Sequence, residues 1–142
     1  KGSLWEGGHR VPAIAYWPGR IKSGETDATV MSMDLFPTMV SIANAAPQTH
    51  PLDGVDISQL LLKKEPLQSR TLFWRYRKQK VARRDQWKLL VDGEKTFLFD
   101  LNNDIGEMEN LAEKEPKVAS ELLKALAEWE LDMPSQDEQK TV

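Results

Sequence analysis

The sequence predicts an α+β fold built from two unequal pieces, and three observations support it. A short, nearly continuous apolar run near the start is typical of a strand buried on both faces, and a helical pattern follows it. After the polar residues 63–70, apolar side chains recur with period two, and an amphipathic helical pattern then closes the chain. We therefore predict that residues 1–62 are the closing strand and helix of a larger α/β domain. Residues 70–133 are predicted to be a small four-stranded antiparallel sheet packed by a C-terminal helix.

The first piece is predicted to contain one strand, over residues 11–17, which the turn signal Pro18-Gly19 ends. A helix is predicted over residues 34–45. We expect Asp34 to cap this helix, and Pro37 falls in its first turn, where the missing N–H costs little. An apolar stripe is expected along the helix, formed by Leu35, Met39 and Ile42, with Ala46 as a further candidate.

At the end of the first piece, Asp56 is expected to cap a short helical turn over residues 57–62. The C-terminal helix is predicted over residues 116–133, with Pro116 at its first position. The polar tail, residues 134–142, is expected to be disordered. The strands of the predicted sheet are residues 71–76, 80–84, 87–92 and 96–100. The helix face expected to cover them is formed by Val118, Leu122, Leu126, Trp129 and Met133.

The composition is that of an ordinary globular domain, with 142 residues, 40% of them hydrophobic and 29% charged. A net charge of −3 does not favour nucleic acid or an anionic membrane as a partner. No apolar run approaches the length that a membrane span needs. Without cysteine, disulfides and thiolate metal sites are excluded. Because the chain starts at a lysine inside a motif, we expect it to be part of a longer protein.

The first twelve residues are a polar, glycine-rich stretch that runs directly into the predicted strand. Gly7 and Gly8 permit backbone angles or close approaches that a Cβ would forbid. Lys1 could place a point charge beside an anion. On these grounds alone the stretch is either a loop that handles an anion or an ordinary surface loop.

The string Lys-Gly-Ser-x-Trp-Glu-Gly-Gly-x-Arg-Val-Pro-Ala resembles a segment in the C-terminal half of the type I sulfatases, the arylsulfatase family. Further segments match in the same order, so the resemblance covers nearly the whole chain up to about residue 112. These segments are MDLFPT at 33–38, LDGVD at 52–56, DQWKL at 85–89, LFDL at 98–101 and GEMENL at 106–111.

The resemblance implies the hydrolysis of sulfate esters, with Lys1 in contact with a sulfate oxygen, where charge develops during the reaction. It also implies a Ca²⁺ ion and a formylglycine nucleophile, made from Cys or Ser in a Cys/Ser-x-Pro-x-Arg motif. That motif is absent from this sequence, so an upstream catalytic domain would supply the nucleophile, the metal ligands and the catalytic histidines. We expect the isolated chain to be inactive. The implied substrates are sulfated small molecules or glycans, and the implied compartments are periplasmic, extracellular or lysosomal.

Three other side chains of the motif region and the sheet are candidates for substrate contact or support. His9 is a lone histidine, which makes no metal site, and a structural or rim role is expected for it. Arg10 is expected to hold the loop through an ion pair with Glu6 or Asp34. Trp74 is either part of the core or a platform for a sugar ring.

Two further patterns have plainer explanations than a binding site. The run Asp100-x-Asn102-x-Asp104 resembles the start of an EF-hand, but Ile105 and Leu111 stand where that loop needs Gly and Glu, so we interpret it as a turn. The sheet carries cations that could bind nucleic acid or a sulfated polymer, although a solvated face is the simpler interpretation. They are Arg75, Arg77, Lys78, Lys80, Arg83 and Arg84.

Two alternatives to a sulfatase portion remain open at this stage. One is a stand-alone structural or sulfated-glycan-binding module. The other is a phosphoester-hydrolase relative within the wider alkaline-phosphatase-like superfamily. If residues 11–17 form a strand meant for a larger sheet, their exposed edges also predict a dimer or strand exchange of the chain.

Overall fold

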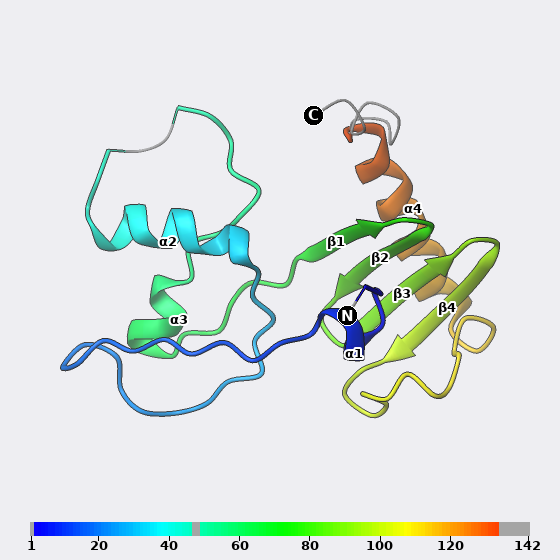
Figure 1. Ribbon diagram of the computed structural model, residues 1–142, viewed down its shortest axis with the longest axis horizontal. Helices are drawn as coiled ribbons and strands as arrows, with labels where there is room; N and C mark the ends of the chain where they lie inside the picture. Colours follow the sequence, from blue (N-terminus) through cyan, green and yellow to red (C-terminus); the bar gives the residue numbers. More distant parts are fainter. Residues whose placement is uncertain (1, 47–48, 134–142) are drawn as a thin grey trace. The chain divides into compact units, whose positions relative to one another are not determined.

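The structure is a computed structural model that describes residues 2–46 and 49–133 (Figure 1). Lys1 and the predicted tail, residues 134–142, lie outside the described residues. The chain divides into two compact units, of which one joins Lys1–Val11 to Ser69–Val142 and the other is Pro12–Gln68. Residues 2–11, which the sequence analysis assigns to the first piece, belong to the same unit as the sheet.

The four predicted strands are confirmed as an antiparallel meander in the order β1-β2-β3-β4. Two-residue turns connect them, and Arg77, Asp85 and Gly93 adopt the left-handed φ that tight hairpins require, at +53°, +54° and +62°. The strands are β1 (Thr71–Tyr76), β2 (Gln79–Arg84), β3 (Trp87–Asp92) and β4 (Lys95–Asp100).

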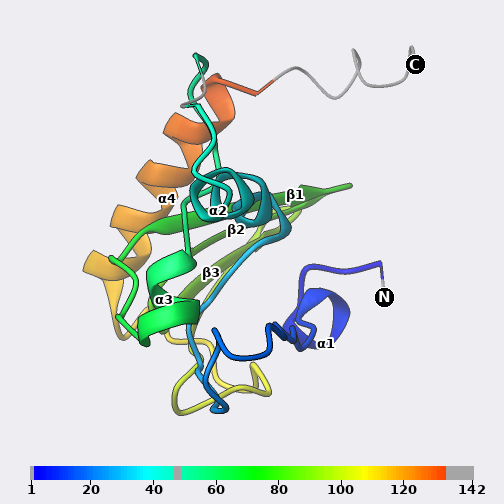
Figure 2. The same cartoon turned by 90° about the vertical axis from the view of Figure 1, so that its left-hand side faces the viewer.

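The C-terminal helix α4 (Pro116–Leu131) covers one face of this sheet, as predicted, and Pro116 opens it. Figure 2 shows α4 on one side of the strands and the N-terminal segment on the other. Phe73 of β1 and Trp129 of α4 stack with their ring centroids 5.2 Å apart. The buried core between helix and sheet consists of Ala82, Leu89, Leu98, Ala119, Leu122 and Leu126.

The opposite face of the sheet is covered by the N-terminal segment, which contains a single helical turn, α1 (Glu6–His9). The predicted loop position of Gly7 and Gly8 is therefore wrong, since both lie in α1. Trp5 packs against the rings of Phe97 and Phe99, with centroids 5.4 and 5.6 Å away. The second buried core consists of Leu4, Val81, Leu90, Phe99 and Leu101. Both faces of the sheet are thus covered within one unit.

The predicted strand over residues 11–17 is wrong, because these residues form no strand pairing in the structure. Their side chains are exposed, and Ile14 is 94% accessible to solvent. A β-strand requires a neighbour that satisfies its N–H and C=O groups. Among the described residues, no strand pairs with this run, and the outer strands β1 and β4 have one partner each, β2 and β3.

The Pro12–Gln68 unit contains three short helical elements, namely η1 (Ser32–Asp34), α2 (Leu35–Ile42) and α3 (Ser58–Lys63). The predicted cap and stripe of the first helix are wrong. The Asp34 carboxylate accepts the N–H groups of Met31 and Val55, at 2.8 and 3.0 Å, and does not cap α2. The helix buries Thr38, while Leu35 and Met39 are exposed. The short helix predicted over residues 57–62 is shifted by one residue, and its N-cap position is Ile57 and not Asp56, although Asp56 Oδ1 accepts the N–H of Ser58 at 2.7 Å.

None of the helices described within residues 2–46 and 49–133 has the length and apolar character that crossing a lipid bilayer requires.

The core under α4 predicts the cost of a single truncation. Leu122 is fully buried, whereas the adjacent Leu123 is 39% exposed. We expect Leu122→Ala to lower the free energy of unfolding by about 2–5 kcal/mol, because it leaves a cavity against the sheet. Leu123→Ala is the matched control and should cost about 0.5 kcal/mol or less. Urea denaturation measures both, and equal losses would contradict the packing described.

Candidate functional site

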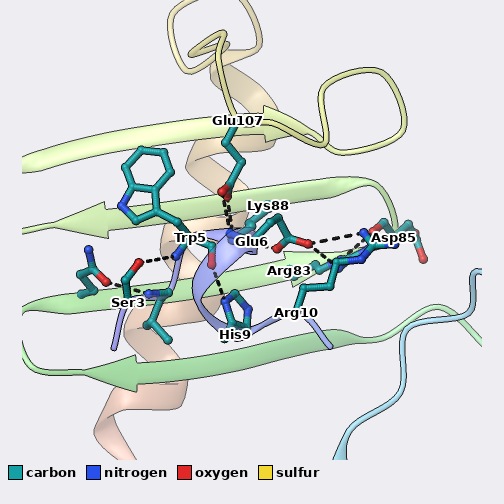
Figure 3. A network of polar contacts seen from close by, with 11 residues as sticks. Ser3, Trp5, Glu6, His9, Arg10, Arg83, Asp85, Lys88 and Glu107 are labelled. Carbon is teal, nitrogen blue, oxygen red and sulfur yellow. Dashed lines mark hydrogen bonds and ion pairs between the residues drawn. The ribbon is translucent and has the colours of Figure 1, made fainter. Parts of the chain in front are cut away.

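A charged side chain is fully buried on the sheet face that carries the N-terminal segment. Lys88, in β3, has no exposed side-chain surface. Its Nζ lies 2.8 Å from Glu6 Oε1 and 2.7 Å from Glu107 Oε1 (Figure 3). Burial of an unpaired ammonium would cost several kcal/mol, so these two carboxylates are what make the position tolerable. We call residues 2–10 the motif segment, and the buried charges form its main polar attachment.

Glu107 contacts both the side chain and the backbone of this arrangement. Its second oxygen, Oε2, accepts the N–H of Glu6 at 2.6 Å. This N–H opens α1 and has no partner within the helix. Glu107 itself has φ +56°, a conformation that is uncommon outside glycine and costs free energy. The residue with the strained backbone is therefore the same one whose carboxylate contacts the motif segment.

Two arginines complete the cluster around Glu6. Arg83 Nη1 lies 3.7 Å and Arg10 Nη1 3.5 Å from Glu6 Oε2, so the structure places Arg10 beside one of its two expected partners. With Lys88 and Glu107, three cations face two carboxylates, which leaves a net charge of +1. We call these five residues the buried charge cluster, in which the Arg10 side chain, 48% accessible, lies at the exposed edge. Its surplus of positive charge favours anions near the motif segment.

The pKa of Glu6 lies below its ordinary value of 4.5. Burial acts to raise this pKa, but the hydrogen bond and charge of Lys88, with the charge of Arg83, outweigh the burial. Glu6 is therefore ionised at neutral pH and balances Lys88.

His9 has one defined tautomer. Its Nδ1 lies 3.1 Å from the carbonyl oxygen of Trp5, and a carbonyl only accepts, so Nδ1 carries the proton. Burial and the nearby charge of Lys88 lower the pKa of His9 below 6.5, which favours the neutral ring with a lone pair on Nε2. The ring packs on Trp74, with centroids 5.3 Å apart. Trp74 is partly buried against the second core. The two candidate sugar contacts, His9 and Trp74, are therefore in contact with each other.

The backbone of the motif segment is attached at a second place. Gln79 Oε1, in β2, accepts the N–H of Leu4 at 2.8 Å. Gly8 approaches Ser3 so closely that an added Cβ would lie 2.3 Å from the Ser3 carbonyl oxygen. A Cβ on Gly7 would meet nothing within 4 Å. Of the two glycines of the motif, Gly8 is thus the one that the folded turn requires.

The cations predicted to form a solvated face are largely engaged in ion pairs. Lys80 lies 2.8 Å from Glu130 and Arg84 2.7 Å from Glu121, both on α4. Lys78 lies 3.2 Å from Asp92. Arg83 belongs to the buried charge cluster instead. Neutralised cations offer a polyanion little, so this surface gives weak support for a glycan-binding module.

The acidic run after β4 forms turn hydrogen bonds. Asp100 accepts the N–H of Asn102 at 3.1 Å and the side-chain amide of Asn103 at 2.8 Å. Asp104 accepts the N–H of Glu109 at 2.8 Å. These carboxylates shape the loop that presents Glu107.

Sequence reasoning missed Lys88, Glu107 and Arg83 as members of a common site. One signal was available, because Lys88 interrupts an otherwise apolar strand, Trp-Lys-Leu-Leu-Val, at a position that alternation places on a covered face. The sequence pattern could not identify the partners of Lys88, because Glu6 and Glu107 are far from it along the chain.

Comparison with known proteins gives a consistent result. Residues 1–132 match the family described as N-sulphoglucosamine sulphohydrolase, C-terminal. Bovine arylsulfatase A is 34% identical over 160 residues, covering 92% of this chain and 32% of the relative. Rat arylsulfatase G is 47% identical over 75 residues, covering 51% of this chain and 14% of the relative. Among solved structures, Ps i-CgsB has a TM-score of 0.70 at 25% identity, over 80% of this chain and 27% of that one. It has also been solved in complex with k-i-k-neocarrahexaose. The chain thus spans a third or less of the length of these proteins.

The close approach at Gly8 predicts a difference between two neighbouring glycines. We expect Gly8→Ala to lower the free energy of unfolding by about 1–3 kcal/mol, because the new methyl group overlaps the Ser3 carbonyl. Gly7→Ala should leave the free energy of unfolding unchanged or slightly higher, as alanine favours helical backbone. Thermal denaturation of both variants tests this, and a tolerated Gly8→Ala would contradict the geometry.

The lowered pKa of His9 predicts a pH dependence of stability. Between the folded pKa and 6.5 the unfolded chain binds more protons than the folded chain, so the free energy of unfolding falls as pH falls through this window. His9→Asn keeps an N–H donor near Trp5 but cannot titrate, so its curve should be flatter below about pH 6.5. His50→Asn, at the other histidine, which is exposed, controls for the substitution itself. Parallel curves for wild type and His9→Asn would refute the prediction.

Proposed function

Because the chain belongs to the sulfatase family, of which it carries the C-terminal domain, we propose that it acts as part of an enzyme that hydrolyses sulfate esters. The observation that carries this proposal is the family match over residues 1–132, which includes the motif segment and every strand of the sheet. The chain covers 32% of bovine arylsulfatase A, so the proposal assigns the remaining catalytic groups to an upstream catalytic domain of the same protein.

Within this enzyme, we assign Lys1 the contact with a sulfate oxygen that the family resemblance implies. A fixed ammonium at this oxygen stabilises the negative charge that develops as the sulfuryl group is transferred. Two features of the neighbouring residues support the assignment. The motif segment that continues from Lys1 is attached to the sheet at Leu4 and Glu6, and the buried charge cluster beside it has a net charge of +1.

The proposed substrate is a sulfated small molecule or glycan, in keeping with the arylsulfatase relatives and with the oligosaccharide complex of Ps i-CgsB. His9 is assigned to the rim of the substrate site, where its Nε2 lone pair would accept a hydrogen bond from a substrate hydroxyl. Trp74 would support His9 and offer an aromatic surface beside it. On family resemblance alone, we propose a lysosomal, periplasmic or extracellular location.

The Ca²⁺ ion and formylglycine that the family implies are not assigned to this chain. Among the described residues, no group of three or more His, Cys, Asp or Glu side chains could hold a metal ion. The sequence also contains no cysteine and no Ser-x-Pro-x-Arg motif from which formylglycine could be made. The residues present therefore do not fit either group.

The role of Lys1 is tested in the complete protein that contains this chain. We expect Lys1→Ala to lower kcat/KM for an aryl sulfate such as 4-nitrocatechol sulfate by about 10²- to 10³-fold, because one transition-state contact is lost. Lys117→Ala, at an exposed lysine of α4, is the matched control and should retain activity. Wild-type activity in Lys1→Ala would remove Lys1 from the site. Complete absence of sulfatase activity in the wild-type protein would overturn the proposed function.

A further inference from the structure

We propose that Lys88 is a positioning residue that orients the motif segment and, through it, Lys1. The effect on catalysis rests on the proposed function. The contacts by which Lys88 holds the motif segment can be measured whether or not the protein is a sulfatase. Lys88 lies 87 positions after Lys1 in the sequence (88 − 1 = 87), within the segment DQWKL, for which the family resemblance implied no role.

The position of Lys88 in the sheet makes it a firm attachment point. It lies on β3, an inner strand, where its Cα partners are Arg83 on β2 and Phe99 on β4. Its side chain is fully buried and its Nζ is held by two carboxylates. A group paired through strands on both sides moves less than one on an edge or a loop.

The attachment holds the motif segment at two atoms of one residue. Lys88 Nζ contacts the side chain of Glu6 at 2.8 Å, while Glu107, itself paired with Lys88 at 2.7 Å, accepts the backbone N–H of Glu6 at 2.6 Å. Figure 3 shows these three side chains converging from the sheet, the motif segment and the loop after β4. Two contacts on the side chain and backbone of one residue fix a direction as well as a position.

Apolar packing alone would not give this direction. Leu4 and Trp5 bury apolar surface against the second core, but the hydrophobic effect is not directional. A buried ion pair often adds little net stability relative to apolar side chains of similar volume, whereas it does restrict which arrangement can form. The charged contacts of Lys88 with Glu6 and Glu107 are therefore better explained by their orienting the motif segment than by a gain in stability.

The distance along the chain is short enough for the orientation to reach Lys1. Glu6 is five residues from Lys1, and Leu4, held by Gln79, is three residues from it. Three extended residues span at most about 11 Å, so the attached backbone limits the region that Lys1 can reach. A misplacement of about 1 Å at a reacting group can lower a rate by on the order of 100-fold.

The kinetic test is a double-mutant cycle in the complete protein. We expect Lys88→Met to lower kcat/KM for the aryl sulfate by on the order of 10- to 100-fold. In a Lys1→Ala background, the same substitution should have little further effect, because Lys88 acts through Lys1. Lys80→Met is the matched control, since Lys80 pairs with Glu130 on the opposite face of the sheet. Additive losses from Lys1→Ala and Lys88→Met would overturn the positioning role.

A second measurement examines the attachment without relying on activity. Hydrogen exchange of the Glu6 amide should accelerate by on the order of tenfold or more in Lys88→Met, while exchange in α4 stays unchanged. Glu107→Gln preserves size and removes one charge, and serves if Lys88→Met does not fold. Unchanged exchange at residues 4–8 in the folded variant would overturn the attachment. Faster exchange in a protein without any sulfatase activity would instead refute the proposed function and leave the attachment standing.

Discussion

The burial of one ammonium group, that of Lys88, is the constraint on which the arrangement of the sheet unit depends. An ammonium without exposed surface must be paired, and the one carboxylate of β3, that of Asp92, is engaged by Lys78 and Gln79. One partner comes from the motif segment and the other from the loop after β4. The structure pairs Lys88 by bringing Glu6 and Glu107 to the same face of the sheet.

The two faces of the sheet consequently serve different purposes. The face under α4 is closed by aliphatic side chains such as Leu89 and Leu122, whose burial supplies stability without specifying direction. The other face combines the apolar side chain of Leu4 with the buried charge cluster. The same segment is therefore held by apolar packing and oriented by charged contacts. This division explains how the motif segment, with its single helical turn, is held on a sheet that begins 61 residues later (71 − 10 = 61).

The distribution of charge agrees with a role near an anion. Cations on the sheet face that α4 covers, such as Lys80 and Arg84, are paired with glutamates of α4. Beside the motif segment, three cations face two carboxylates, and His9 is kept neutral by burial and by Lys88. Positive charge is thus in surplus next to the residues that follow Lys1, where the family resemblance implies a sulfate group.

Local patterns in the sequence were sufficient for the meander, for α4 with Pro116 at its start and for the family, because periodicity and motif are properties of neighbouring residues. The strand predicted over residues 11–17 failed, since an apolar run cannot specify whether a pairing partner exists. The motif was visible from the sequence, but its support by Lys88 and Glu107 was not. Contacts across 82 and 101 positions depend on how the strands and the first residues come together, and only the tertiary structure decided them.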